Sequence, residues 1–96
     1  MALKNASSIT KVAASTDNIM LVAENLDRFA LSFYNNSTDS LYVKFGLGAS
    51  LDSFTIRIPS YGYFEIPFNN CYTGRIDGFW SGVDGSVMIT EGLLFG

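Results

Sequence analysis

Apolar and polar residues alternate along several short stretches of the chain. The alternation is clearest at Phe29–Phe33, Leu41–Phe45, Phe54–Ile58 and Phe64–Ile66. A period of two places every second side chain on the same face, which predicts β-strands that bury one face. Turn-forming residues close each stretch, and these short connections favour antiparallel pairing.

The full pattern predicts about seven strands. They are expected at Ile19–Ala23, Arg28–Tyr34, Leu41–Phe45, Phe54–Ile58, Tyr63–Ile66, Arg75–Trp80 and Val87–Thr90. A spacing of about ten residues suits an all-β domain, either a single antiparallel β-sandwich of jelly-roll or Ig-like type or a small barrel. No stretch carries a capped apolar stripe of helical period, so no helix is required.

Two connections are predicted to be hairpins. The six polar residues Asn35–Ser40 join two of the expected strands, and all belong to types that favour turns. Asp84-Gly85 lies between Trp80 and Val87, and this dipeptide favours a type I′ turn with positive φ at both central residues.

The chain is expected to divide into three segments. Residues 1–18, rich in Ala, Ser and Thr, form an extended N-terminal arm that is either mobile or ordered against a neighbour. Residues 19–91 form the β-sandwich domain. Residues 92–96 form an apolar C-terminal tail, which either completes the chain's own core as a last half-strand or inserts into a neighbouring subunit.

Length and charge restrict the possible partners. With 96 residues there is room for one domain with a modest core, so burial through self-association would add stability. The nine acidic and six basic residues are spread without blocks, which argues against a nucleic-acid partner. No apolar run is long enough for a membrane span or a signal peptide, so neither a membrane partner nor secretion is expected.

Few residues could carry out chemistry. The chain has no His, so the single Cys71 cannot act in a Cys–His pair, and we expect it to be a small buried apolar residue. Glu65 and Asp77 could in principle form a glycosidase pair on neighbouring strands. Both are expected to point outward, where acidic residues keep a sheet soluble. We therefore predict no enzyme activity, no metal and no cofactor.

Aromatic side chains and the tail are the candidate partner surfaces. Trp80 is expected in the core, whereas Tyr42 and Tyr63 alternate away from the buried face and Tyr61 lies in a turn. Outward rings can stack on sugars or pack on a protein, or they can shield the sheet through cross-strand pairs. The predicted interface residues are Tyr42, Tyr61, Tyr63, Leu93, Leu94 and Phe95.

Several segments resemble small β-rich virion proteins of tailed bacteriophages. They are Ser32–Thr38, Leu41–Gly46, Phe54–Pro59, Gly62–Pro67, Tyr72–Trp80 and the closing Thr90-Glu91. The resemblance covers about residues 22–91 and leaves out the N-terminal arm. It implies a structural protein of the virion, in the first place a decoration or cement protein on the head.

The implied partners are the major capsid protein or other virion proteins. A rigid small domain with a reaching arm or tail also suits symmetric self-contacts, so a homo-oligomer is expected, with a trimer preferred over a dimer or a monomer. The alternative hypothesis is a carbohydrate-binding module or a tail- or fibre-associated adhesion module, with Tyr42, Tyr61, Tyr63 or Trp80 as an open platform.

Overall fold

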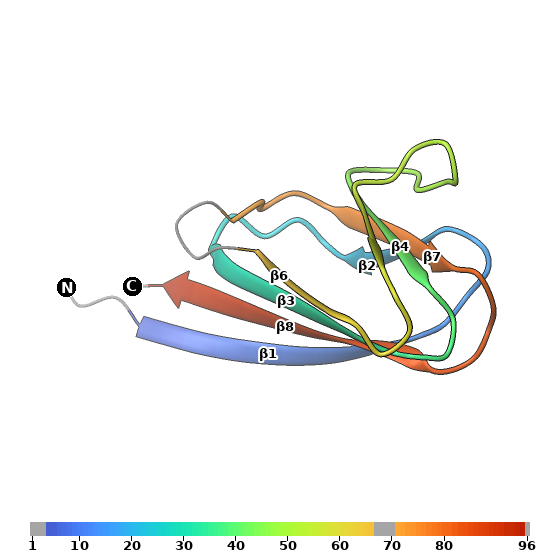
Figure 1. The fold of residues 1–96 in the computed structure, drawn as a ribbon. Coiled ribbons are helices and arrows are strands. Elements are labelled where there is room, and N and C mark those ends of the chain that lie inside the picture. The colour runs from blue at the N-terminus through green and yellow to red at the C-terminus, as the bar shows by residue number, and fades with distance from the viewer. Residues whose placement is uncertain (1–3, 67–70, 96) are drawn as a thin grey trace.

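The protein is an all-β, sandwich-like molecule of eight antiparallel strands in two sheets (Figure 1). The computed structural model describes the backbone of residues 4–66 and 71–95 and the side chains of residues 6–66 and 71–94, and no described residue is helical. The strands are β1 (Lys4–Ala13), β2 (Ile19–Val22), β3 (Arg28–Asn36), β4 (Leu41–Phe45), β5 (Ile56–Ile58), β6 (Tyr63–Ile66), β7 (Ile76–Trp80) and β8 (Ser86–Phe95).

The chain passes between the two sheets at almost every connection. Sheet A has the strand order β1-β8-β3-β6 and sheet B the order β2-β7-β4-β5. Within the described chain, β4 and β5 are the one pair of consecutive strands that are hydrogen-bonded to each other. The prediction of all-β structure and two-layer packing is therefore confirmed, with one strand more than the pattern indicated.

Both predicted hairpins are wrong. Asn35–Ser40 connects β3 of sheet A to β4 of sheet B, and the turn at Asp84-Gly85 connects β7 of sheet B to β8 of sheet A. Gly85 has φ 78°, but among the described residues Tyr61 is the one non-glycine residue with positive φ, so Asp84 lacks the type I′ conformation. Alternation indicates which face of a strand is buried. It does not indicate which other strand is hydrogen-bonded beside it.

The expected N-terminal arm is largely a strand. β1 pairs with β8 without interruption from Lys4↔Phe95 to Ala13↔Ser86. The side chains of residues 6–11 are all exposed, because β1 lies at the edge of sheet A. A strand whose side chains are mostly exposed needs no apolar alternation, which is why the sequence pattern missed it.

The expected C-terminal tail is the end of β8. The Leu94 N–H donates to the Asp27 carbonyl (2.8 Å), and Leu93 pairs with Ala6 on the other side. The tail therefore follows the first of the two alternatives, because residues 92–95 pair within the chain's own sheet A. Deleting Leu93–Phe95 would also remove the β8 partners of Lys4, Asn5 and Ala6, so that truncation disturbs the fold together with any binding.

The core lies between the inner faces of the two sheets. Trp80 is 1% exposed, which confirms its predicted place there. The same buried cluster also contains Leu21, Phe33, Leu41, Val43, Ile58, Ile76, Val87 and Ile89. Gly78 lies among them, and a Cβ on it would approach Leu21 Cδ1 to 2.6 Å and the Tyr42 carbonyl to 2.8 Å. The Leu21 side chain therefore occupies the space that Gly78 leaves.

A buried arginine ties two connections to sheet A. The Arg28 side chain is fully buried and its Nε donates to Glu91 Oε2 (2.8 Å). Its Nη1 donates to the carbonyls of Tyr72 (2.8 Å) and Gly74 (3.2 Å), and Nη2 donates to the carbonyl of Ala23 (2.6 Å). The guanidinium thus holds the connection after β2 and the connection before β7 at the same end of the sheet.

A buried asparagine does the same for the β3–β4 and β5–β6 connections. Asn35 is fully buried at the end of β3, and its Nδ2 donates to the carbonyls of Asp39 (2.8 Å), Ile58 (3.1 Å) and Pro59 (3.1 Å). Its Oδ1 accepts from Trp80 Nε1 (3.0 Å). One amide therefore connects β3 to three segments of sheet B and its turns.

Candidate functional surfaces

The predicted interface residues do not form one site. Tyr42 lies on the outer face of sheet B, whereas Tyr63 lies on the outer face of sheet A. Tyr61 lies in the turn between β5 and β6. Leu93 and Leu94 are half-buried in β8, and the side chain of Phe95 lies outside the described residues.

Tyr42 belongs to an aromatic cluster on sheet B. Its ring stacks on Phe79 with centroids 5.0 Å apart and an interplanar angle of 12°. Phe54 contacts the same ring edge-on at 5.1 Å. Tyr42 is consequently half-buried by its neighbours, and cross-strand shielding describes it better than an open platform.

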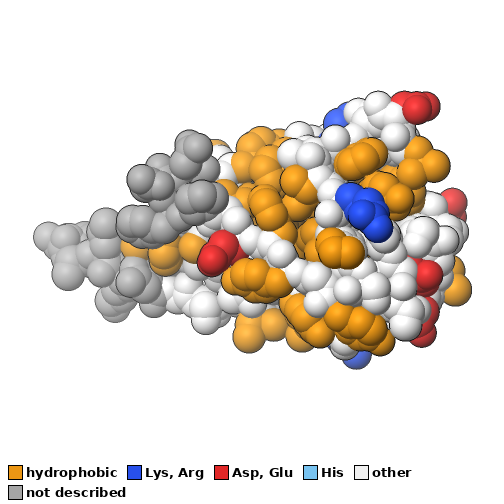
Figure 2. Space-filling view, in the orientation of Figure 1, with side chains coloured by type: hydrophobic (Ala, Val, Ile, Leu, Met, Phe, Trp, Pro, Cys, Tyr) orange, Lys and Arg blue, Asp and Glu red, His pale blue; other side chains and the backbone are white. Residues whose placement is uncertain are grey.

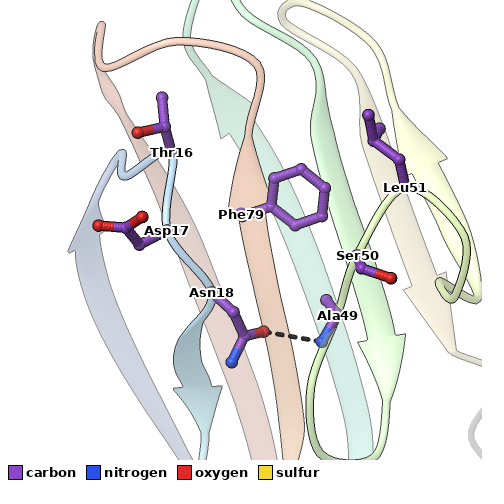
Figure 3. A pocket seen from close by; sticks show the side chains of 7 residues that line it. All are labelled: Thr16, Asp17, Asn18, Ala49, Ser50, Leu51 and Phe79. Carbon is purple, nitrogen blue, oxygen red and sulfur yellow. Dashed lines mark hydrogen bonds between the residues drawn. The ribbon is translucent and has the colours of Figure 1, made fainter.

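A pocket opens beside this cluster, between two connections (Figure 3). It has a volume of about 330 Å³. Its lining residues are Thr16, Asp17 and Asn18 from the β1–β2 connection, Ala49, Ser50 and Leu51 from the β4–β5 connection, and Phe79 from β7. Figure 3 shows the Phe79 ring between the two walls, and we call this hollow the Phe79 pocket.

The two walls of the Phe79 pocket are joined by a buried carboxylate. Asp77 Oδ2 accepts from Asn18 Nδ2 (3.0 Å) and from the Gly48 N–H (2.8 Å). Asn18 Oδ1 accepts from the Ala49 N–H (2.8 Å), which is the dashed contact in Figure 3. Gly48 has φ 80°, a conformation that glycine adopts without strain, and this lets the β4–β5 connection fold back over sheet B.

The expectation that Asp77 is a solvated outward residue is therefore wrong. Its side chain does leave the outer face of sheet B, but it is 0% exposed because the β4–β5 connection covers it. Arg75 Nε donates to its Oδ1 (2.7 Å). Glu65 is on the outer face of sheet A, so the core separates the two carboxylates that could have formed a glycosidase pair.

The sequence contained little that could reveal the Phe79 pocket. Asn18 and Ala49 come from connections about thirty residues apart, and neither belongs to a motif. The one signal in the sequence is the pair Gly46 and Gly48, which allows the β4–β5 connection to reverse direction because both residues have positive φ. Only the packing of the two connections brings the walls together.

Acid will loosen the walls of the Phe79 pocket. Burial by itself raises the pKa of Asp77, but hydrogen bonds from Arg75, Gly48 and Asn18 outweigh it and hold the pKa below 3.8. A lowered folded-state pKa stabilises the fold at pH above 3.8, and this contribution is lost as the pH falls through the lowered value.

Replacing Asp77 with asparagine will therefore reduce the free energy of unfolding at pH 7 by about 1–3 kcal/mol, because an amide is a poorer acceptor for three donors. The difference from the wild type will shrink below pH 3.8 as the native carboxyl is protonated. Urea unfolding between pH 2 and pH 7 measures the loss of stability and its pH dependence. A loss that does not change with pH would contradict the role of the ionised Asp77 carboxylate.

A shallow groove crosses the outer face of sheet A. It has a volume of about 160 Å³ and is lined by Ser7, Ala30, Leu31, Ser32, Tyr63, Glu65, Thr90, Glu91 and Gly92. Tyr63 is 61% exposed and stands beside Tyr34, its partner on β3. Small side chains form the floor, and we call this hollow the sheet A groove.

Large apolar side chains are exposed mainly in the connections. The β4–β5 connection presents Leu47 (67% exposed), Leu51 (67%) and Phe54 (41%). Figure 2 shows apolar side chains over much of the visible face, with charged groups at few places. The β4–β5 connection is bonded to sheet B through the Gly48 N–H and Asp77, so its exposed apolar residues lie on an ordered backbone.

Cys71 behaves as a structural residue. Its side chain is half-buried and packs against the core cluster. Burial raises the pKa of the thiol, an effect that Arg28 opposes and Glu91 supports. The thiolate is therefore disfavoured at neutral pH, and a thiol in this state is a weak nucleophile.

The described part of the chain contains no group of three or more His, Cys, Asp or Glu residues placed to hold a metal ion. In the same residues, no helix has the length and apolar character needed to cross a membrane. Comparisons of the chain with models of protein families, with curated proteins and with solved structures find no match.

Proposed function

We propose that this chain is a structural protein of a tailed-bacteriophage virion, a capsid decoration or cement protein that binds the head through protein–protein contacts. The proposed location is the virion, and the proposed partners are the major capsid protein or other virion proteins. The segments between residues 22 and 91 that resemble such proteins support this proposal.

We further propose that the two sheets form a jelly roll. The strand orders β1-β8-β3-β6 and β2-β7-β4-β5, with a change of sheet at all connections but one, support it. Jelly rolls of eight strands are used by viral capsid domains and by lectins. A fold alone does not establish a function, which depends on the residues of a binding surface.

The observation that carries the proposal is the apolar β4–β5 connection. Leu47, Leu51 and Phe54 are exposed on a backbone that Asp77 fastens to sheet B. Exposed apolar side chains grouped on an ordered surface are typical of protein interfaces. We propose that this connection contacts the capsid.

The test is co-sedimentation of the purified protein with undecorated capsids. A Leu47→Ser, Leu51→Ser double variant should bind at least tenfold more weakly than the wild type. Leu26→Ser is the matched control, because Leu26 is 79% exposed in a different connection. Full binding by the double variant, or no binding by the wild type, would contradict the proposal.

Tyr61 offers a test that separates binding from folding. It has φ 56° and its side chain is 55% exposed. A left-handed conformation costs a non-glycine residue roughly 1–2 kcal/mol, and asparagine tolerates it better than tyrosine.

Replacing Tyr61 with asparagine will therefore raise the free energy of unfolding by about 0.5–1 kcal/mol. Because Tyr61 lies at the opposite end of β5 from the β4–β5 connection, capsid binding through that connection should be unchanged. Urea unfolding and co-sedimentation measure the two effects. Loss of binding in a more stable protein cannot come from misfolding. Weaker binding by this variant would show that the capsid contact extends to the β5–β6 turn.

The sheet A groove favours a second candidate function, a carbohydrate-binding or adhesion module. Its exposed Tyr63 ring can stack on a sugar, while Glu65, Ser32 and Thr90 can bond to sugar hydroxyls. Calorimetric titration with a panel of glycans tests it, with Tyr63→Ala as the variant and Tyr61→Ala as the control. Heat of binding that Tyr63→Ala abolishes would favour this function over capsid binding.

A further inference from the structure

The four sheet edges of the described chain differ in how well they are protected. β2 has four residues and a register shift between Met20 and Val22. β5 has three residues and is followed by Pro59, which lacks an N–H, while β6 has four residues and carries the exposed Glu65. Short strands, irregularities, proline and charge are the devices that keep an edge from pairing with another chain.

The fourth edge, β1, has almost none of these devices. It is ten residues long, it keeps an unbroken register with β8, and it contains neither Gly nor Pro. The segment from Asn5 to Thr10 is uncharged. Figure 1 shows β1 running along the border of its sheet. The longest edge is thus the one left open.

The hydrogen-bond pattern identifies which residues face this open edge. The Ala14 N–H donates to the Gly85 carbonyl (3.0 Å), so this is a hydrogen-bonded pair that continues the β1–β8 ladder. Bonded and non-bonded pairs alternate in an antiparallel ladder. The backbone groups turned away from β8 therefore belong to Asn5, Ser7, Ile9, Lys11 and Ala13.

We propose that β1 pairs with β1 of a second copy of this chain, antiparallel and around a two-fold axis at Ile9. This register joins Ile9 to Ile9, Ser7 to Lys11 and Asn5 to Ala13, so each outward-facing backbone group finds a partner. Ile9 is 66% exposed in the single chain, and the pairing brings the two Ile9 side chains together on one face.

The alternation also avoids repulsion between the lysines of β1 across the proposed pair of strands. Outward-facing residues of β1 carry odd numbers, so odd positions pair with odd positions across the axis. Lys4 and Lys11 consequently never stand opposite each other. The paired strands extend sheet A into one continuous sheet, β6-β3-β8-β1 from each copy.

An isologous contact of this kind has two-fold symmetry and closes as a dimer. A two-fold dimer thus takes the place of the trimer that the sequence favours. It rests on the geometry of β1 and not on the proposed function. A dimer that ignores capsids would leave the inference intact and contradict the function.

The first experiment measures the solution mass of the full chain over a range of concentrations by light scattering. Ile9→Lys places two ammonium groups opposite each other at the axis, and we expect the dimer to dissociate at least tenfold more readily. Val83→Lys adds the same charge in the β7–β8 connection, at a side chain that is 74% exposed, and should leave the dimer unchanged. Emission of the buried Trp80 confirms that each variant is folded.

The second experiment tests the register by oxidative cross-linking in a Cys71→Ala background. Facing residues of a hydrogen-bonded pair have Cα atoms about 5.5 Å apart, within the range of a disulfide. Ile9→Cys should therefore give a covalent dimer, whereas Ser8→Cys, which faces Thr10 of the other copy, should not. A monomer at all concentrations, a trimer, or a dimer that survives Ile9→Lys would overturn the proposal.

Discussion

Replacing Arg28 with methionine will lower the free energy of unfolding by about 3–5 kcal/mol. The guanidinium is fully buried and donates to Glu91 and to the carbonyls of Ala23, Tyr72 and Gly74. Methionine fills a similar volume but supplies no donor, so these acceptors lose their partner and Glu91 becomes an unpaired, largely buried charge.

Thermal and urea unfolding measure this loss. For a domain of this size, each kcal/mol corresponds to roughly 4–8 °C in Tm, so a fall of roughly 12–40 °C is expected. Glu91→Gln separates the contribution of the ion pair from that of the hydrogen bonds, because the amide oxygen still accepts from Arg28 while the negative charge is removed. A methionine variant within about 1 kcal/mol of the wild type would show that Arg28 does not hold the two connections.

Replacing Asn35 with aspartate will lower the free energy of unfolding by about 3 kcal/mol at pH 7, although the side chain keeps its shape. The carboxylate can still accept from Trp80 Nε1. It cannot donate to the carbonyls of Asp39, Ile58 and Pro59, and it places a charge in the core.

The introduced carboxyl will also reverse the usual pH dependence of stability. Burial next to three carbonyls raises its pKa above that in the unfolded chain. A raised folded-state pKa means that the penalty is smallest at low pH, where the carboxyl is neutral and can donate, and grows as the pH rises. Urea unfolding from pH 3 to pH 8 measures this slope. A penalty that does not grow with pH would contradict the bonding assigned to Asn35.

Arg28 and Asn35 show why sequence patterns leave part of the fold undetermined. Both interrupt strands that otherwise alternate, and a pattern of hydrophobic positions assigns them simply to a strand. Their partners lie 4 to 63 residues away in the chain. Such bonds depend on which connections meet in space, and these two residues hold four of the connections that change sheet.

The candidate surfaces also combine features that the sequence predicts with features that only the tertiary structure shows. The outward positions of Tyr63 and Tyr42 follow from alternation and are confirmed, because a strand has one face in and one face out. The shielding of Tyr42 by Phe79 and Phe54 does not follow, because it depends on which strand and which connection lie beside it.

By itself, the sequence determined that this chain is an all-β molecule, where the half-buried strands lie, and that Trp80 belongs to the core. Those features arise from local alternation and from the gain in burying apolar side chains. The tertiary structure decided that β1 is a strand, that the chain changes sheet at the expected hairpins, and that Asp77 is buried. These depend on hydrogen bonds and coverage between segments far apart in the chain, for which a single sequence contains no periodic signal.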